Sequence, residues 1–160
     1  MSKNYITIIS ANDKSINELF EETKDSLNIK KPVKRSLIKD KIYMHSKALD
    51  NSIIGYAKLH NIDFDNGIYT LKFICPTEFD EHLSISEIRK MGCTFDLSRQ
   101  ISYIPYTNPL FHLINMWDKA FSLDGNLCRN ARDEKIKIKR KIKSMTNKWY
   151  FFKLTLILNL

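Results

Sequence analysis

The tripeptide Asp65-Asn66-Gly67 restricts the fold of this chain more than any other feature of its sequence. Asn-Gly favours the two positive φ angles of a tight two-residue hairpin turn. With Asn66 and Gly67 as the loop, one face pairs mostly apolar residues: Phe64 with Tyr69, Ile62 with Leu71 and His60 with Phe73. The other face is polar. The alternation is consistent on both arms, so the sequence predicts a β-hairpin, with His60 packed among apolar neighbours.

Further runs of β-branched and aromatic residues predict more strands around this hairpin. Strands are expected at residues 5–9, 42–45, 53–64, 68–75 and 101–104. A basic connector, residues 30–41, contains Pro32 and therefore cannot continue a helix.

Three segments carry helix signals. An amphipathic pattern over residues 16–27 predicts a first helix, capped by Asn12 or Ser15. Ser84 with Glu87 forms a capping box that opens a short second helix, which Gly92 ends. A third helix is expected from Pro109 to near Gly125, with a buried stripe formed by Leu110, Leu113, Ile114, Trp117 and Phe121. The order of elements predicts an α+β fold, a small mixed sheet curled into a barrel with flanking helices.

The net charge of +8 divides the chain into two parts. Residues 1–124 hold 16 Lys/Arg and 16 Asp/Glu, whereas residues 125–160 hold 10 and 2. We therefore expect one neutral domain, 1–124, followed by a basic tail, 125–160. The tail ends in an apolar segment from Trp149, which is too short to span a bilayer. This segment would pack on the domain, pair with a partner or a second copy, or lie on a membrane surface.

Composition excludes several classes of protein. Hydrophobic residues make up 43% of the chain, which is enough for one core and excludes a wholly disordered protein. The three cysteines are widely spaced and odd in number, which argues against a disulfide framework and a zinc site and favours a reducing compartment. With no signal peptide or membrane span evident, we expect an intracellular protein that needs no metal or cofactor.

Three stretches resemble the PUA-like superfamily and, within it, the EVE and YTH domains that bind modified bases. YITIISANDKSI is similar to the first strand, which ends in a Ser, here Ser10, and passes into a helix. DKIYMHSKALDNSIIGYAKL resembles the strand-turn-strand that carries Gly55 and Ala57. LSISEIRKMG and SRQISYIP resemble the short helix followed by Arg99-Gln100 and a strand. The resemblance implies a PUA-like domain across roughly residues 4–121.

The resemblance also implies a base-binding pocket at the ends of the first two strands. The residues of this chain at those positions are Ser10, Asn12, Tyr43, His45 and Ser46. Hydroxyl and amide groups recognise base edges, and an aromatic ring stacks on a base. The alternative is that Ser10 and Asn12 cap a helix and that Tyr43 belongs to the core.

We therefore expect a non-enzymatic module that binds nucleic acid, RNA or DNA, including a modified base. Phosphate contacts are expected from Lys34 and Arg35 of the connector and from a tail cluster, Lys137, Lys139, Arg140, Lys141 and Lys143. One alternative is a small nuclease that uses two of the four histidines as acid and base. The other is a protein-interaction module that inhibits a nucleic-acid-processing complex.

Overall fold

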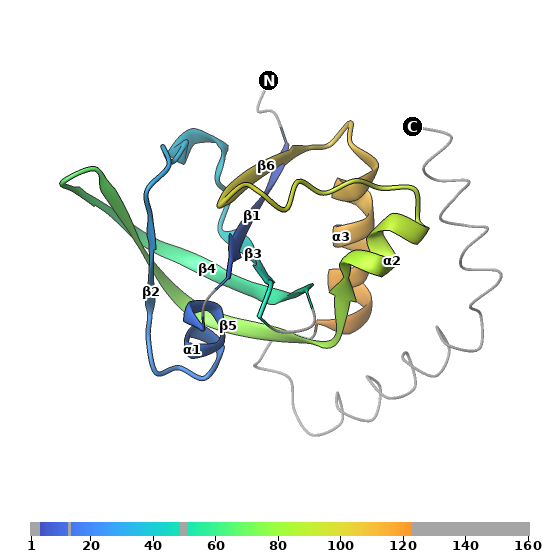
Figure 1. Cartoon of the computed structure of the whole chain (residues 1–160), viewed down its shortest axis with the longest axis horizontal. Coiled ribbons are helices and arrows are strands. Elements are labelled where there is room, and N and C mark those ends of the chain that lie inside the picture. The colour runs from blue at the N-terminus through green and yellow to red at the C-terminus, as the bar shows by residue number, and fades with distance from the viewer. Residues whose placement is uncertain (1–3, 13, 49–50, 123–160) are drawn as a thin grey trace.

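The computed structural model of the chain describes residues 4–12, 14–48 and 51–122. These residues form β1 (Tyr5–Ala11), α1 (Ser15–Phe20), β2 (Ser26–Ile29), the 3₁₀ turn η1 (Arg35–Leu37), β3 (Lys41–Ser46), β4 (Ser52–Asp65), β5 (Ile68–Ser84), α2 (Ile85–Lys90), β6 (Ile101–Pro105) and α3 (Pro109–Phe121). The strands make one sheet in the order β2-β5-β4-β3-β1-β6, in which β1 and β3 are parallel and every other pair is antiparallel. The sheet curls into a half-barrel, so the predicted α+β class is confirmed (Figure 1).

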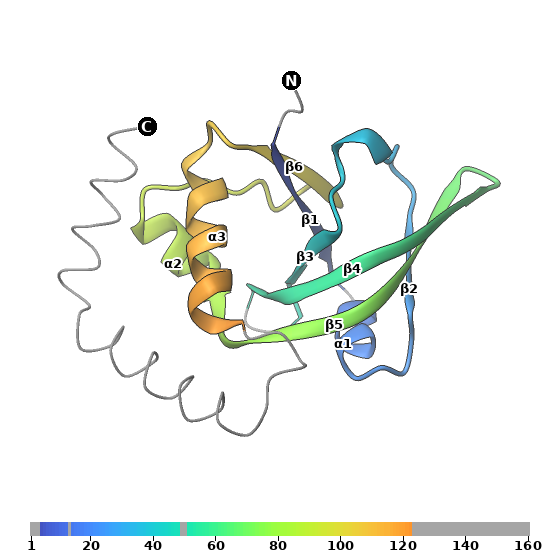
Figure 2. The ribbon, with the colours of Figure 1, turned by 180° about the vertical axis from the view of Figure 1, so that it is seen from behind.

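The hairpin is formed by β4 and β5, and its distal part extends away from the rest of the domain (Figures 1 and 2). Phe64 faces Tyr69 as predicted, and Gly67 has a φ of 77°. The pairing shifts between Leu59 and Asn61, so Phe73 faces Leu59 rather than His60. His60 is exposed, and the predicted packing role for it is therefore wrong. The predicted end of the second arm at residue 75 is also wrong, because β5 continues to Ser84.

The predicted helix over residues 16–27 is much shorter in the structure. α1 ends at Phe20, and Glu22 adopts a φ of 58°, which turns the chain toward β2. No apolar residue occurs between Phe20 and Leu27, so a longer helix would have had no residue to bury over its next turn. In the strand conformation both Leu27 and Ile29 are buried.

The other two helices begin where their capping residues predicted. The Glu87 backbone N–H donates to Ser84 Oγ at 3.0 Å, and Gly92 follows α2 with a φ of 73°. Asn108 Oδ1 caps α3 at 3.0 Å. The whole predicted stripe of α3 is buried, although α3 ends at Phe121 rather than near residue 125.

The two faces of the curled sheet bury two separate cores. The first contains Ile8, Tyr43 and Tyr56 packed with α2 and α3, and the second contains Ile9, Ile42 and Met44 packed with α1 and β2. In both views α2 and α3 lie together on one side, and α1 lies on the other, next to β5 (Figures 1 and 2).

Within the described ranges, no helix has the length and apolar character required to cross a bilayer. The same residues contain no group of three His, Cys, Asp or Glu side chains arranged to hold a metal ion. Cys75 is exposed and Cys93 is buried.

Candidate functional site

The parallel pair β1 and β3 brings two carboxyl-terminal strand ends to the same edge of the sheet. Ser10 is opposite His45, and the Lys47 backbone N–H donates to the Ala11 carbonyl at 3.0 Å. On the other side of β1, the Ser10 N–H donates to the Gln100 carbonyl at 2.9 Å. Three segments that are distant in sequence therefore meet here: the exit of β1, the exit of β3 and the loop that enters β6.

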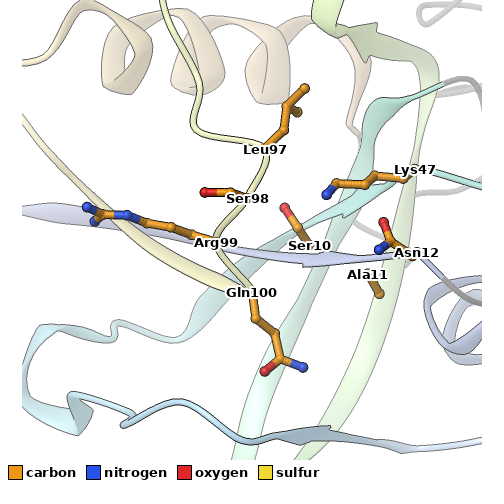
Figure 3. A pocket seen from close by; sticks show the side chains of 8 residues that line it. All are labelled: Ser10, Ala11, Asn12, Lys47, Leu97, Ser98, Arg99 and Gln100. Atoms are coloured by element: carbon orange, nitrogen blue, oxygen red, sulfur yellow. The ribbon is translucent and has the colours of Figure 1, made fainter.

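These three segments line a polar cavity of about 260 Å³ that is open to solvent. Its lining residues are Ser10, Ala11, Asn12, Lys47, Leu97, Ser98, Arg99 and Gln100. In Figure 3 the ammonium end of Lys47 extends toward Ser10, whereas Arg99 points away from both. The Lys47 ammonium has no ion-pair or hydrogen-bond partner within residues 4–12, 14–48 and 51–122. It is therefore the cation available to a ligand in this cavity.

A second hollow of about 300 Å³ adjoins the first and shares Ser10, Ala11 and Gln100 with it. The Gln100 side chain borders both hollows, and its amide is held at both ends. Its amide nitrogen donates to the Asn28 carbonyl at 3.2 Å, and its amide oxygen accepts from the Lys30 N–H at 3.1 Å. The two hollows thus share a side-chain amide that hydrogen bonds hold in place.

The loop that supplies the third wall is organised by Asp96. One carboxylate oxygen accepts from the backbone N–H of Ser98 at 2.9 Å and from its hydroxyl at 2.5 Å. The other oxygen pairs with Arg99 Nε at 3.1 Å. The hydrogen bonds from Ser98, together with the Arg99 charge, hold the pKa of Asp96 below its usual value. The Arg99 charge is thereby partly neutralised, which leaves Lys47 as the main positive group of the cavity.

Beneath the cavity floor, Ser10 is connected to a buried histidine. Ser10 Oγ lies 2.9 Å from His45 Nδ1, and His45 Nε2 lies 2.9 Å from Asn51 Oδ1. Burial lowers the pKa of His45, an effect that the Asn51 hydrogen bond partly opposes and the Lys47 charge reinforces. The imidazole is therefore neutral at pH 7, and with the Asn51 oxygen as acceptor its proton lies on Nε2. Nδ1 must then accept the Ser10 hydroxyl proton, so the Ser10 oxygen presents lone pairs to the cavity.

The structure separates the residues that the family resemblance had grouped into one pocket. Ser10 and Asn12 line the cavity, His45 supports it from below, and Ser46 is completely buried. Tyr43 is buried in the first core, and its hydroxyl donates to Asp118 at 2.5 Å. Tyr43 does not line the cavity at the strand ends.

Residues that sequence reasoning missed supply most of the lining, above all Lys47 and Ser98. Arg99-Gln100 was noted only as part of a family pattern. The Asp96-Leu97-Ser98 turn is the local signal that could have identified this loop, because Asp followed two residues later by Ser is typical of an Asx turn.

The predicted phosphate contacts lie elsewhere. Lys34 and Arg35 are exposed at η1 and line none of these hollows, and the Lys34 backbone N–H donates to the Tyr103 hydroxyl at 2.8 Å. The tail cluster, residues 137–143, and the apolar C-terminal segment lie outside the described residues.

Comparison with known proteins gives a likeness of fold. No protein-family model matches the chain, and no curated protein matches it significantly. Among solved structures, the chain is similar to ASCH from Zymomonas mobilis, with a TM-score of 0.54 and 9% identity over 74% of this chain and 96% of that one. Two single-residue variants of the same protein match with TM-scores of 0.53 and 0.54, both at 10% identity. At this level of identity the likeness concerns the fold alone, and the shared fold is consistent with the predicted α+β, PUA-like architecture.

Proposed function

We propose that this chain is a non-enzymatic module that binds single-stranded RNA, with one base or phosphate held in the cavity between Ser10, Lys47 and Ser98. The observation that carries the proposal is an ammonium group without an intramolecular partner among the described residues, placed over a floor of fixed polar groups. The PUA-like fold supports it, because EVE and YTH domains of that superfamily bind bases. A cavity of about 260 Å³ is near the lower limit of ~300 Å³ for ligand pockets, which suits one base rather than a dinucleotide.

The chemistry of the floor favours a base with an exocyclic amino group. Because the Ser10 proton is donated to His45, the Ser10 oxygen is an acceptor and requires a donor on the ligand. None of the residues that line the cavity is aromatic. Recognition would therefore rest on hydrogen bonds to a base edge, which is exposed only where the base is unstacked from a duplex.

The test is a fluorescence-polarisation titration of the full-length chain with labelled single-stranded RNA, repeated at several salt concentrations. Lys47→Ala should weaken binding and reduce the slope of log K against log salt by about 0.7, the value for one phosphate of a single strand. Ser10→Ala should leave that slope unchanged and reduce the preference for amino-bearing bases. Lys72→Ala is the matched control, because Lys72 is an exposed lysine of the hairpin that lines neither hollow.

If Lys47→Ala bound as tightly and with the same slope as the original chain, the proposed site would be wrong. Matched DNA oligonucleotides test whether the 2′-hydroxyl matters. Oligonucleotides methylated at the exocyclic amine test the finer EVE- or YTH-type reading of a modified base. RNA cleavage instead of stable binding would favour the nuclease alternative, and absence of both would favour a protein partner.

The nuclease alternative has little geometric support in the described residues. Each histidine there has a different environment: His45 contacts Ser10 and Asn51, His82 pairs with Glu78 at 2.8 Å, and His112 contacts the Tyr106 carbonyl, while His60 is exposed on the hairpin. Within the described residues no hydrogen bond joins two of these histidines, so the structure offers no support for a histidine acid-base pair.

A further inference from the structure

A larger cavity of about 590 Å³ lies at the opposite end of the same two strands. Its walls come from the amino-terminal parts of β1 and β3, from β4, from α3, and from the two residues before β3. Tyr5 and Ser10 are five positions apart on β1, so the two cavities are separated by roughly 16 Å along the strand at about 3.3 Å per residue. No residue lines both cavities.

Three lysines, Lys39, Lys41 and Lys58, line this second cavity. Lys41 of β3 is directly opposite Lys58 of β4, and like charges opposite one another destabilise a sheet. The Lys41 ammonium is partly compensated by Asp118 at 3.0 Å. Lys39 donates to Asn4 Oδ1 at 2.6 Å, which brings a third positive charge to the same rim without neutralising it.

Lys58 is the uncompensated member of this set. Its side chain is exposed, and its ammonium has no carboxylate or hydrogen-bond partner in the part of the chain that the structure describes. Asp118 does not also pair with Lys58, because that buried carboxylate already accepts hydrogen bonds from both Lys41 and the Tyr43 hydroxyl. Asp40 is the other acidic residue at the cavity, so the lining keeps an excess of positive charge.

The remaining wall is apolar and aromatic, which distinguishes this cavity from a simple anion site. Ile6 of β1 and Phe111 of α3 both line it, and Phe111 is half-buried against the first core. Asn115 lines the cavity one helical turn after Phe111, so a flat side chain and an amide lie on the same face of α3. A ring that packs on Phe111 could therefore also make a hydrogen bond to Asn115.

We propose that this second cavity binds a nucleoside monophosphate. The phosphate, with a charge of about −1.5 to −2 at pH 7, lies between Lys58 and Lys39, and the base packs on Phe111. The volume is within the ~300–1,000 Å³ typical of small-molecule sites. This site is independent of RNA binding at the first cavity, because the two share no lining residue.

The test is isothermal titration calorimetry of the full-length chain with AMP, and separately with adenosine and with inorganic phosphate. We expect saturable binding of AMP that is tighter than binding of either half. Lys58→Ala should weaken AMP binding about tenfold, which corresponds to about 1.4 kcal/mol. Phe111→Leu should weaken AMP and adenosine while leaving phosphate unchanged.

Two controls separate this site from general electrostatics and from the first cavity. Lys72→Ala removes the same charge from the distal hairpin and should leave AMP affinity unchanged. The AMP titrations are also run in the Lys47→Ala background, in which the first cavity lacks its lysine and contributes less to binding of an amino-bearing base or a phosphate. AMP should also raise the midpoint of thermal unfolding of the original chain more than sodium chloride of equal ionic strength does, by mass action on the folded state. Lys58→Gln should remove that excess.

Absence of saturable AMP binding would overturn the proposal, and so would equal weakening by Lys58→Ala and Lys72→Ala. Equal affinity for phosphate and AMP would refute the contact between the base and Phe111. Because the Lys47→Ala background reduces any contribution of the first cavity to AMP binding, failure of the second site can be recognised separately from failure of RNA binding.

Discussion

Protonation of His45 should reduce the stability of the domain and change the hydrogen-bonding character of the first cavity. His45 is fully buried between Ser10 and Asn51, and burial lowers its pKa in the folded state below 6.5. In the unfolded chain the imidazole regains the ordinary value of about 6.5. Below pH 6.5 the unfolded chain therefore binds more protons than the folded domain, and stability must fall as the pH falls.

The size of the effect follows from linkage. The contribution of His45 is fully present above pH 6.5 and is lost as the pH falls from there toward the folded pKa, below which it no longer changes. In that interval the free energy of unfolding changes by at most about 1.4 kcal/mol per pH unit, because one proton is involved. Protonation would also make Nδ1 a donor, so Ser10 would turn its own proton toward the cavity and become a donor to the ligand.

Urea unfolding of the full-length chain at pH values from 8 to 5 measures this slope. His45→Gln should remove most of the pH dependence between 6.5 and 5, whatever it does to stability at pH 8. His60→Gln is the matched control, because His60 is exposed on the hairpin. Nitrogen NMR shifts of the imidazole report the tautomer directly. An unchanged slope in His45→Gln, or a ring proton on Nδ1 at pH 7, would refute the reasoning.

Three further predictions concern stability and electrostatics. Gly55→Ala should lower the free energy of unfolding, measured with urea, by about 3 kcal/mol, which is the upper end for overpacking. The reason is that a Cβ there would lie 2.2 Å from the Thr77 backbone oxygen, and neither strand can withdraw alone. A loss below 1 kcal/mol would contradict this close approach. Tyr43→Phe should lower the free energy of unfolding by about 1.5–3 kcal/mol in the same assay, because it removes the hydroxyl that donates to the buried Asp118 carboxylate. An unchanged stability would show that Lys41 alone satisfies the Asp118 carboxylate. Replacing the five basic residues at 137–143 with Gln should flatten the salt dependence of RNA binding and weaken all sequences alike, and an undiminished slope would move the main phosphate contacts to the connector, residues 30–41.

Local signals in the sequence predicted most of the fold. Asn66-Gly67, Ser84 with Glu87, and Asn108-Pro109 each determine a turn or a cap through their own backbone chemistry, and all three occur where expected. The errors arose where tertiary packing, rather than local sequence, determined the conformation of a segment. Leu27 fits the apolar face of a helix, but as part of β2 it lies opposite Leu71 and fills the second core, a contact that helix periodicity cannot reveal.

The candidate site was harder to predict because its lining comes from segments that meet only in the folded sheet. Ser10 and His45 were expected near one another from the family resemblance, and the parallel register places them opposite each other. Tyr43 was expected beside them, but it lies two residues before His45 on the same face and closer to the other end of β3. Ser98 belongs to a loop 88 positions after Ser10, and only the pairing of β6 with β1 brings the two together.

The one parallel pair among the described strands explains how the two proposed ligand sites, which differ in chemistry, can occur in so small a domain. Parallel strands share their ends, so the residues leaving β1 and β3 gather at one rim and those entering them gather at the other. At the exit rim the chain presents Lys47 and short polar side chains, which suit a base edge or a phosphate of a longer strand. At the entry rim, Lys41 and Lys58 face each other beside the aromatic wall of α3, which suits a compact anion that carries a ring. Since the described domain has almost equal numbers of acidic and basic residues, its attraction for anions must come from such local juxtapositions, and single lysine substitutions at each rim should therefore have large and separable effects.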